Sequence, residues 1–412
     1  MHGQTQRMVL SFELDEEMLA KYAPVTYETV PQEDWDLCKY NDNIYLMPED
    51  NYAQWTNHGF IYRLDWAKEA GLEDGVHSWE DMTTYFKYVC DNKDELGVVT
   101  PWDSDGTQFS QMAGGWISSH SDFVSIDGLA AAAYWGGTKD DLYTIVSPLY
   151  TDTDSLVEFA KMMKEWDEMG VWKTDVLNNT SSDNREDFKL GKTAAEQHHT
   201  ETWTDLVSKT PENVPGAEVG FFWFGEEEKN VTALNITHGA MAVSYGSENP
   251  ERALMVYDLL RNDAECYDLI NYGQKGVQWD VNDEGLRITP ESYNSDTDGI
   301  TTNFWWGRND LLEIRDATKD WDKIDVMYKE LEDAAIDYPY GKFVANVDDI
   351  QSYINNINEV NTNYMKQIAY GKYTGTAEEI VAEYQQALKD AGMDIVIEEL
   401  QKQLNEVYGD AE

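Results

Sequence analysis

Basic residues are scarce in this chain. Its 412 residues include 30 lysines and arginines against 79 aspartates and glutamates, so the formal net charge is −49. Such a negative field repels phosphate backbones and anionic lipid headgroups, and we expect neither nucleic acid nor a membrane surface as a partner. The acidic residues are spread along the chain rather than gathered in a tail, which is typical of a solvated globular surface.

Cysteines and long apolar runs are also few. Cys38, Cys90 and Cys266 are odd in number and widely spaced, so they predict neither a disulfide framework nor a zinc site. No stretch approaches the roughly 18 consecutive apolar residues that indicate a membrane-spanning helix. Residues 1–17 lack the basic and apolar regions of a secretion signal, and we expect none in this chain.

The short signatures of several common catalytic sites are missing. The chain holds no G-x-S-x-G elbow, no P-loop and no G-x-G-x-x-G segment. We therefore expect a protein that is not an enzyme, with no catalytic residues and no cofactor. The 79 acidic residues keep one alternative open, because a glycoside hydrolase needs only two carboxylates roughly 5 to 10 Å apart.

The length and the order of elements favour two α/β lobes. A chain of 412 residues exceeds what one core usually supports, and 42% of its residues are hydrophobic. The segment 40–72 predicts a crossover between the lobes past a cleft. In it, an apolar run at 44–47 and a strand at 59–62 flank a polar loop that carries Tyr52 and Trp55.

Capping patterns predict several helix starts. A serine or threonine followed three residues later by an acidic residue satisfies the first free N–H groups of a helix. The pairs are Ser78 with Asp81, Ser155 with Glu158, and Thr376 with Glu379. A further helix is expected from Pro250, and the chain from Trp321 onward is predicted to be mainly helical.

The remaining segments are predicted as strands or aromatic loops. Strands are expected at 219–224 and 236–245, because both are short apolar runs. Glycine, serine, aspartate and aromatic residues alternate over 97–146, which predicts irregular structure there. The same reasoning predicts loops at 198–203 and 271–310.

Several separate segments follow one family pattern. They are YNDNIYLMP at 40–48, GFIYRLDWAKEAGL at 59–72, SWEDM at 78–82, FKLGKTA at 188–194, NPERALMVYDLL at 249–260, YGQKGVQWDV at 272–281 and the run 347–408. Together they resemble the extracellular solute-binding proteins of ABC importers, family 1. The likeness is greatest to the carbohydrate-type lipoproteins of Gram-positive bacteria, whose C-terminal domain of unknown function the last run resembles.

This resemblance implies a type II periplasmic-binding-protein-like α/β fold with two lobes and a hinge. Lobe one would comprise 1–43 and 238–315, lobe two 44–237, and a C-terminal helical segment, 316–412, would pack on lobe two. The first lobe would be incomplete, since about the first hundred residues of the family pattern have no counterpart. The chain is then a fragment or has a miscalled start, and a truncated form that binds no ligand is a second alternative.

The resemblance also implies a function. A sugar or oligosaccharide would be captured in an aromatic-lined cleft between the lobes and delivered to an ABC permease in the membrane. The protein would be a monomer, extracellular and associated with the cell envelope.

Aromatic side chains are the first candidates for sugar binding, because their faces stack on the apolar C–H faces of sugar rings while polar groups bind the hydroxyls. The chain has 15 tryptophans, and those on predicted helix faces, such as Trp66, Trp79 and Trp166, are expected in the core. The family pattern places a ligand-facing turn at 198–203. The candidate ligand-binding residues are Tyr52, Trp55, Trp116, His199, Glu201, Trp203, Trp223, Trp279, Trp305, Trp306 and Arg308.

Two segments contain residues of the types that ligate metals. His198, His199 and Glu201 fit no zinc spacing, so no metal is predicted there. Residues 294–299, NSDTDG, resemble the opening of a calcium loop, but Trp305 occupies the twelfth position, where a bidentate glutamate is usual. A polar turn is predicted, with weak calcium binding as the alternative.

Overall fold

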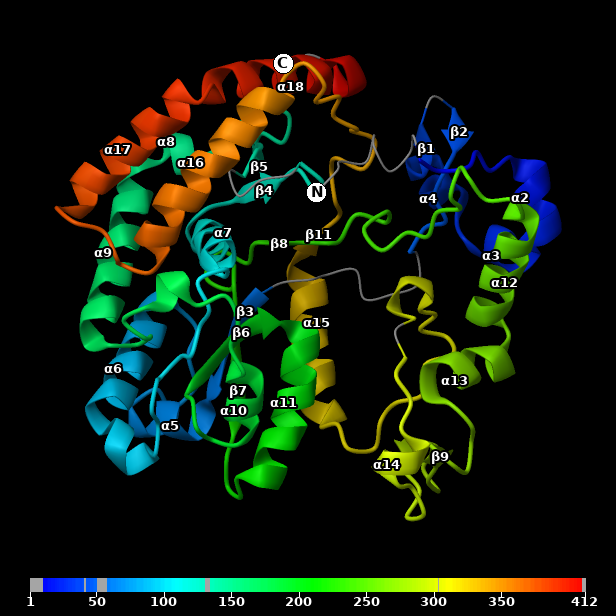
Figure 1. Ribbon diagram of the computed structural model, residues 1–412, viewed down its shortest axis with the longest axis horizontal. Helices are drawn as coiled ribbons and strands as arrows, with labels where there is room; N and C mark the ends of the chain where they lie inside the picture. Colours follow the sequence, from blue (N-terminus) through cyan, green and yellow to red (C-terminus); the bar gives the residue numbers. More distant parts are fainter. Residues whose placement is uncertain (1–9, 41, 50–57, 130–133, 303, 410–412) are drawn as a thin grey trace. The chain divides into compact units, whose positions relative to one another are not determined.

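The computed structural model describes residues 10–40, 42–49, 58–129, 134–302 and 304–409. The chain forms two compact units (Figure 1). Unit 1 comprises Met1–Gln54 and Leu234–Lys319, and unit 2 comprises Trp55–Ala233 and Asp320–Glu412. The chain therefore changes unit three times, and its first change falls inside the segment predicted as a crossover.

Unit 1 is mainly helical, and its strands are short two-stranded pairs. Its elements are α2 (Glu16–Tyr22), α3 (Pro24–Thr29), α4 (Gln32–Leu37), β1 (Lys39–Tyr40), β2 (Asn43–Ile44), α12 (Pro250–Asn262), α13 (Ala264–Tyr272), β9 (Asp280–Val281), β10 (Arg287–Ile288), α14 (Ser295–Asp298) and the 3-10 turn η2 (Trp305–Gly307). Helix α12 packs against α2, α3 and α13.

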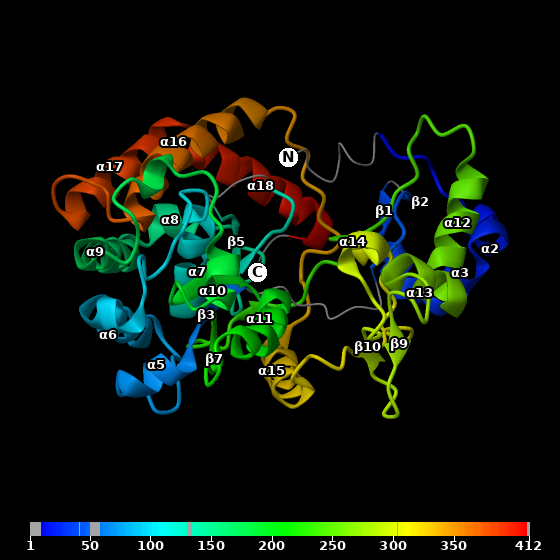
Figure 2. The same cartoon turned by 60° about the horizontal axis from the view of Figure 1, so that its bottom comes forward.

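Unit 2 is larger and surrounds a three-stranded sheet with helices (Figure 2). Its elements up to β8 are β3 (His58–Arg63), α5 (Leu64–Glu69), α6 (Trp79–Leu96), α7 (Phe109–His120), β4 (Phe123–Ser125), β5 (Gly136–Thr138), α8 (Pro148–Thr151), α9 (Thr153–Met169), η1 (Val176–Asn178), α10 (Asn184–Lys189), β6 (Ala195–His199), α11 (Thr200–Asn213), β7 (Val219–Trp223) and β8 (Val231–Thr232). The C-terminal part adds α15 (Trp321–Ala334), β11 (Ala335–Ile336), α16 (Gln351–Ala369), α17 (Ala377–Asp390) and α18 (Met393–Tyr408).

Strand β3 is the centre of the sheet and is buried on both faces. It pairs antiparallel with β6 on one side and with β7 on the other. Successive side chains of a strand point to opposite faces, and here Phe60 and Tyr62 enter a large core while Ile61 enters a second one. The large core takes residues from α6, α7, α9 and α16–α18, and the second from β7, α11 and α15.

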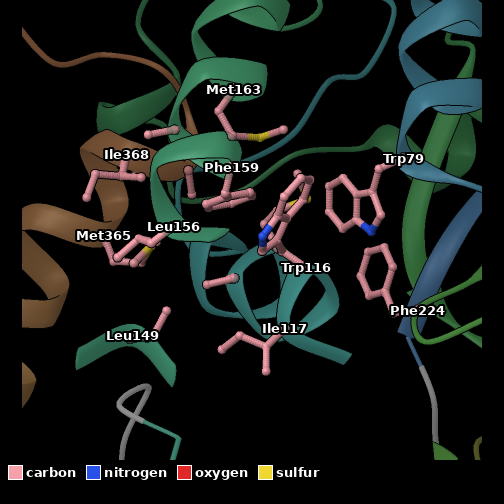
Figure 3. Close-up of a cluster of buried hydrophobic side chains, with 14 of the residues drawn as sticks. Trp79, Trp116, Ile117, Leu149, Leu156, Phe159, Met163, Phe224, Met365 and Ile368 are labelled. Atoms are coloured by element: carbon pink, nitrogen blue, oxygen red, sulfur yellow. The ribbon is translucent and has the colours of Figure 1, made fainter. Parts of the chain in front are cut away.

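Aromatic rings dominate the large core (Figure 3). Trp79 is fully buried, and its ring stacks on Phe224 at 5.3 Å between centroids and meets Trp116 edge to face at 5.5 Å. Trp66, Trp79 and Trp166 all lie in this core, as their helical positions predicted. Offset and edge-to-face aromatic packing of this kind fixes one arrangement of the helices around the sheet.

The C-terminal helices belong to the same core. Helix α16 packs on α7 and α9, and α17 packs on α9 (Figures 1 and 2). The hydroxyl of Tyr370 donates a hydrogen bond of 2.6 Å to the carbonyl of Asp105, and that of Tyr373 donates one of 2.9 Å to the carbonyl of Ala160. None of the described helices is both long and apolar enough to cross a membrane.

Several predicted elements are confirmed. The strands at 59–62 and 219–224 correspond to β3 and β7, and the helix from Pro250 is α12. Ser78 caps α6, because its Oγ accepts a hydrogen bond of 3.0 Å from the backbone N–H of Asp81. Thr376 and Glu379 form the full reciprocal capping box of α17.

Other predicted elements are wrong. Residues 236–245 form isolated bridges rather than a strand, because an apolar run without periodicity does not distinguish strand from loop. The irregular segment 97–146 contains helix α7, whose glycines weaken the helical signal. Helix α9 is capped by Asp152 rather than Ser155, whose own N–H donates to the Asp152 carboxylate.

Candidate functional site

Unit 2 holds a cavity of about 290 Å³ beside its central sheet. Helix α7, strand β4 and the ends of β3, β7 and β8 form its walls. Its lining residues are His58, Gln111, Gly114, Gly115, Ile117, Ser118, Phe123, Ser125, Tyr134, Phe224, Asn230, Val231 and Thr232. The volume lies near the lower end of the roughly 300–1,000 Å³ typical of small-molecule pockets.

Two glycines of α7 allow two aromatic rings to approach the helix. A Cβ on Gly114 would lie 2.3 Å from the hydroxyl oxygen of Tyr134, and a Cβ on Gly115 would lie 2.4 Å from the ring of Phe224. Tyr134 is held further by a hydrogen bond of 2.5 Å from its hydroxyl to the carbonyl of Ser110. A residue with a side chain at either glycine would displace these rings from the cavity wall.

The polar part of the wall is fixed by hydrogen bonds. The side-chain amide of Asn230 donates to the carbonyls of Ser121 and Phe123, at 2.8 and 2.9 Å. His58 Nδ1 lies 2.9 Å from the amide nitrogen of Gln197. An amide nitrogen can only donate, so His58 Nδ1 is the acceptor and its proton is on Nε2. The cavity therefore presents oriented amide, imidazole and hydroxyl groups, and none of the lining residues that the structure describes is an acid, a lysine or an arginine.

His58 belongs to a cluster of three neutral histidines. It pairs across the sheet with His199, and the ring of His198 lies 4.2 Å from that of His199 and 5.6 Å from that of His58. Burial, followed by the charge of His199, lowers the pKa of His58 to about 4. Burial, followed by the charges of His199 and Arg185, lowers the pKa of His198 to about 3.

The predicted residues His199 and Glu201 lie at the junction of β6 and α11. His199 is the last residue of β6 and caps α11, since its Nδ1 accepts from the N–H of Thr202 at 3.4 Å. Glu201 lies in the first helical turn and accepts a hydrogen bond of 3.2 Å from the hydroxyl of Tyr328. The predicted loop at 198–203 is therefore wrong, because strand passes directly into helix. His199 contacts the cavity residue His58 through its ring.

Three predicted tryptophans of unit 2 lie in its cores rather than in loops. Trp116 on α7 is 3% exposed, and its indole N–H donates to Ser155 Oγ at 2.9 Å. Trp203 on α11 is 4% exposed and stacks on Phe221. Trp223 on β7 is fully buried. The placement of Trp116 and Trp203 in loops was wrong, because both lie on helices that bury them.

The predicted residues of unit 1 form a separate group. Trp279 is 4% exposed and donates through its indole N–H to the carbonyl of Gly273 at 2.9 Å. Trp306 stacks on Tyr257 with centroids 5.9 Å apart. Arg308 pairs with Asp310 and Glu313.

The remaining predicted positions either lie outside the described residues or belong to the segment 294–299. Tyr52 and Trp55 lie outside the described residues, as does the side chain of Trp305. At 294–299, Asn294 Oδ1 accepts from the N–H of Asp296 and Asp298 Oδ2 accepts from the N–H of Asn294, which is the bonding of a polar turn. Weak calcium binding there stays an untested alternative.

The cavity residues were not among the predicted ones. Gln111, Tyr134 and Asn230 come from three segments far apart in sequence, and only the fold brings them together. One local signal was present. Glycine destabilises the interior of a helix. Two adjacent glycines there, Gly114 and Gly115, therefore indicate that another group packs closely against the helix at this point.

The fold defined by these units is that of the extracellular solute-binding proteins, and the predicted α/β fold is confirmed. The N-glycan transport solute binding protein of Streptococcus pneumoniae is similar, with a TM-score of 0.71 and 16% identity over 98% of this chain and 84% of that chain. A solute binding protein of Bifidobacterium longum infantis, associated with an ABC transporter and binding human milk oligosaccharides (HMO), has a TM-score of 0.62 and 12% identity over 98% and 85%. At such identities the likeness shows the fold alone.

Residues 339–408 match the family model described as a domain of unknown function, DUF3502. This confirms the predicted resemblance of the C-terminal run, which contains α16, α17 and α18. None of the curated proteins compared with this chain matches it.

Proposed function

We propose that the protein is the solute-binding component of an ABC importer and that it captures a neutral sugar or oligosaccharide without catalysis. The cavity of unit 2 carries this proposal. It combines the aromatic rings of Tyr134 and Phe224 with the fixed amide of Asn230 and the neutral imidazole of His58. Aromatic faces stack on sugar C–H groups, and oriented amides and imidazoles bind hydroxyls.

The charge of the cavity favours a neutral ligand. Among the residues that the structure describes, its lining has no lysine or arginine to pair with a uronate or phosphate, and the net charge of −49 further disfavours an anionic glycan. The neighbours of known structure support the ligand class. The Streptococcus pneumoniae protein has been solved with Man1GlcNAc and with Man5GlcNAc, and the Bifidobacterium protein binds milk oligosaccharides.

The same proposal implies a cellular location and a partner for the protein. Solute-binding proteins of importers work outside the cytoplasmic membrane and hand their ligand to a permease. We therefore place this protein at the cell envelope as a monomeric lipoprotein whose partner is a membrane permease. Labelling of intact cells tests the location, and size-exclusion chromatography of the protein tests the monomeric state.

Binding and turnover distinguish the proposal from its alternatives. We expect Man5GlcNAc, or another neutral oligosaccharide from a glycan array, to bind saturably in calorimetry. Tyr134→Ala should weaken this binding at least tenfold, because it removes one aromatic wall. Tyr245→Ala is the matched control, since Tyr245 is 73% exposed and lies in unit 1.

Two results would contradict the proposal. New reducing ends after incubation with the bound oligosaccharide would favour a glycoside hydrolase with paired carboxylates. Absence of binding across a broad array of neutral glycans would favour a truncated form that binds no ligand.

A further inference from the structure

Three side chains of unit 2 that the sugar site does not use converge on one point. Glu80 lies in the first turn of α6, His120 is the last residue of α7, and Glu227 follows strand β7. One ligand atom from each lies within 4.8 Å of the other two. None of the three lines the cavity, so the group is separate from the proposed sugar site.

His120 is oriented as metal-bound histidines usually are. Its Nδ1 lies 2.9 Å from the backbone carbonyl of Trp116, and a carbonyl can only accept, so Nδ1 carries the proton. In the neutral ring, Nε2 then holds a free lone pair. A hydrogen bond from one ring nitrogen to a carbonyl is the usual way in which proteins fix the tautomer of a metal-bound histidine.

The ring of His120 is also held in place. It stacks on the indole of Trp116 with centroids 3.6 Å apart and planes 18° apart. Trp116 is itself anchored, because it is 3% exposed and hydrogen-bonded to Ser155. A ligand group whose rotamer is fixed before binding loses little conformational entropy when the ion arrives.

The two carboxylates face each other without a cationic partner. Within the described part of the chain, neither Glu80 nor Glu227 forms an ion pair with lysine or arginine. A divalent cation between the two carboxylates would replace the repulsion between like charges with attraction.

We propose that Glu80, His120 and Glu227 bind a divalent transition-metal ion, with Zn²⁺ as the preferred ion. One imidazole and two carboxylates form a mixed nitrogen and oxygen donor set, whereas Ca²⁺ and Mg²⁺ prefer oxygen alone. Zinc commonly takes three protein ligands of these types and a water molecule as the fourth.

The proposed ion would join three segments, and two of them also contribute to the wall of the proposed sugar cavity. Helix α7 supplies Gly114 and Gly115 to its wall, and the strand that precedes Glu227 leads to Phe224. An ion bound only by the folded state stabilises that state by mass action. Metal binding should therefore raise the melting temperature of the protein in the absence of sugar.

Titration of metal into the chelator-treated full chain tests the proposal. In buffer of physiological ionic strength with millimolar Ca²⁺ present, ZnCl₂ should bind at one site per chain and raise the melting temperature. Glu80→Gln, Glu227→Gln and His120→Ala should each weaken this binding at least tenfold. The matched controls are Glu95→Gln, an exposed acid on the same helix α6, and His198→Gln, a histidine elsewhere in unit 2.

Substitution of Co²⁺ for Zn²⁺ gives a second readout that needs no stable variant. We expect a d–d absorption spectrum of a four- or five-coordinate site with nitrogen and oxygen ligands, and its loss on addition of one equivalent of Zn²⁺. The proposal is overturned if Zn²⁺ binds no more tightly than Ca²⁺, if the control variants lose binding equally, or if the cobalt spectrum is that of the hexaaqua ion.

Discussion

At the scale of single residues, the helix, strand or loop that carries an aromatic side chain decides whether it lies in a core or lines the cavity. Trp116, Trp203 and Trp223 are all at most 4% exposed, although each was a candidate for sugar stacking. The sequence shows how many tryptophans there are but not where their side chains point, since that depends on which face of each helix or strand is buried. Tyr134, which lines the cavity, has a positive φ of 48° and belongs to none of the described helices or strands.

The three half-buried histidines, His58, His198 and His199, make the stability of unit 2 depend on pH. The folded-state pKa values of His58 and His198, about 4 and 3, lie below the usual value of 6.5. The unfolded state therefore binds more protons between about pH 4 and 6.5, and stability decreases as the pH falls through this window. Above pH 6.5 both states hold neutral histidines, and this contribution is fully present.

We expect the urea midpoint of the wild type to fall from pH 7 to pH 4.5 by more than that of His198→Gln. Acidic residues titrate in the same range, so the difference between the two proteins isolates the histidine contribution. Each unit of pKa shift corresponds to about 1.4 kcal/mol for a fully shielded group, and partial exposure of His198 reduces this value. Parallel profiles for the two proteins would contradict the prediction.

At the scale of secondary-structure elements, the correct predictions were those that rest on contacts between residues close in sequence. The caps of α6 and α17 were predictable because Ser78 and Thr376 bond to backbone groups three residues away. Helix α7 was not, since no side chain caps it and its two adjacent glycines disfavour helix. Those glycines lie where the rings of Tyr134 and Phe224 touch the helix, so their presence there follows from tertiary packing.

Helix α7 provides a direct test of this explanation. Alanine usually stabilises a helix relative to glycine by up to about 1 kcal/mol, but a Cβ at Gly115 would lie 2.4 Å from the Phe224 ring. We expect Gly115→Ala to destabilise the protein by about 1–3 kcal/mol in urea unfolding, as overpacked cores do. It should also weaken sugar binding, because the ring forms the cavity wall.

Gly246→Ala is the control for this substitution. Gly246 has no positive φ, and its nearest neighbour to an added Cβ is Ser244 Oγ at 4.0 Å. We expect a change of less than about 0.5 kcal/mol there. A Gly115→Ala protein as stable as the wild type would show that Phe224 can move, and the proposed role of the glycine would be wrong.

At the scale of the whole molecule, each unit is built from segments distant in sequence. Unit 2 joins Trp55–Ala233 to Asp320–Glu412. Its large core is therefore complete only when the C-terminal helices α16, α17 and α18 are in place. The family resemblance predicted this α/β fold because its motifs recur in a fixed order. The sugar cavity was not predicted, since its residues come from β3, α7 and the segments around Tyr134 and Asn230.

The C-terminal helices should therefore be essential to unit 2 rather than an independent domain. Ile357, Met365 and Leu400 lie in the same core as Trp79, and the indole N–H of Trp135 contacts Met393 Sδ at 3.2 Å. Deletion of 351–412 would expose this apolar surface. We expect the shortened chain to lose its cooperative unfolding transition and its near-ultraviolet circular dichroism.

Tyr370→Phe is the matched control for the deletion. It removes the hydrogen bonds of the hydroxyl to the carbonyl of Asp105 and to Ser104 Oγ but leaves the ring in the core, so a loss of about 1–2 kcal/mol with cooperative unfolding is expected. A deletion variant that still unfolds cooperatively would mean that residues before 351 complete the core by themselves. The helices that match DUF3502 would then be an appended domain, and their contribution to the large core would not be needed for the stability of unit 2.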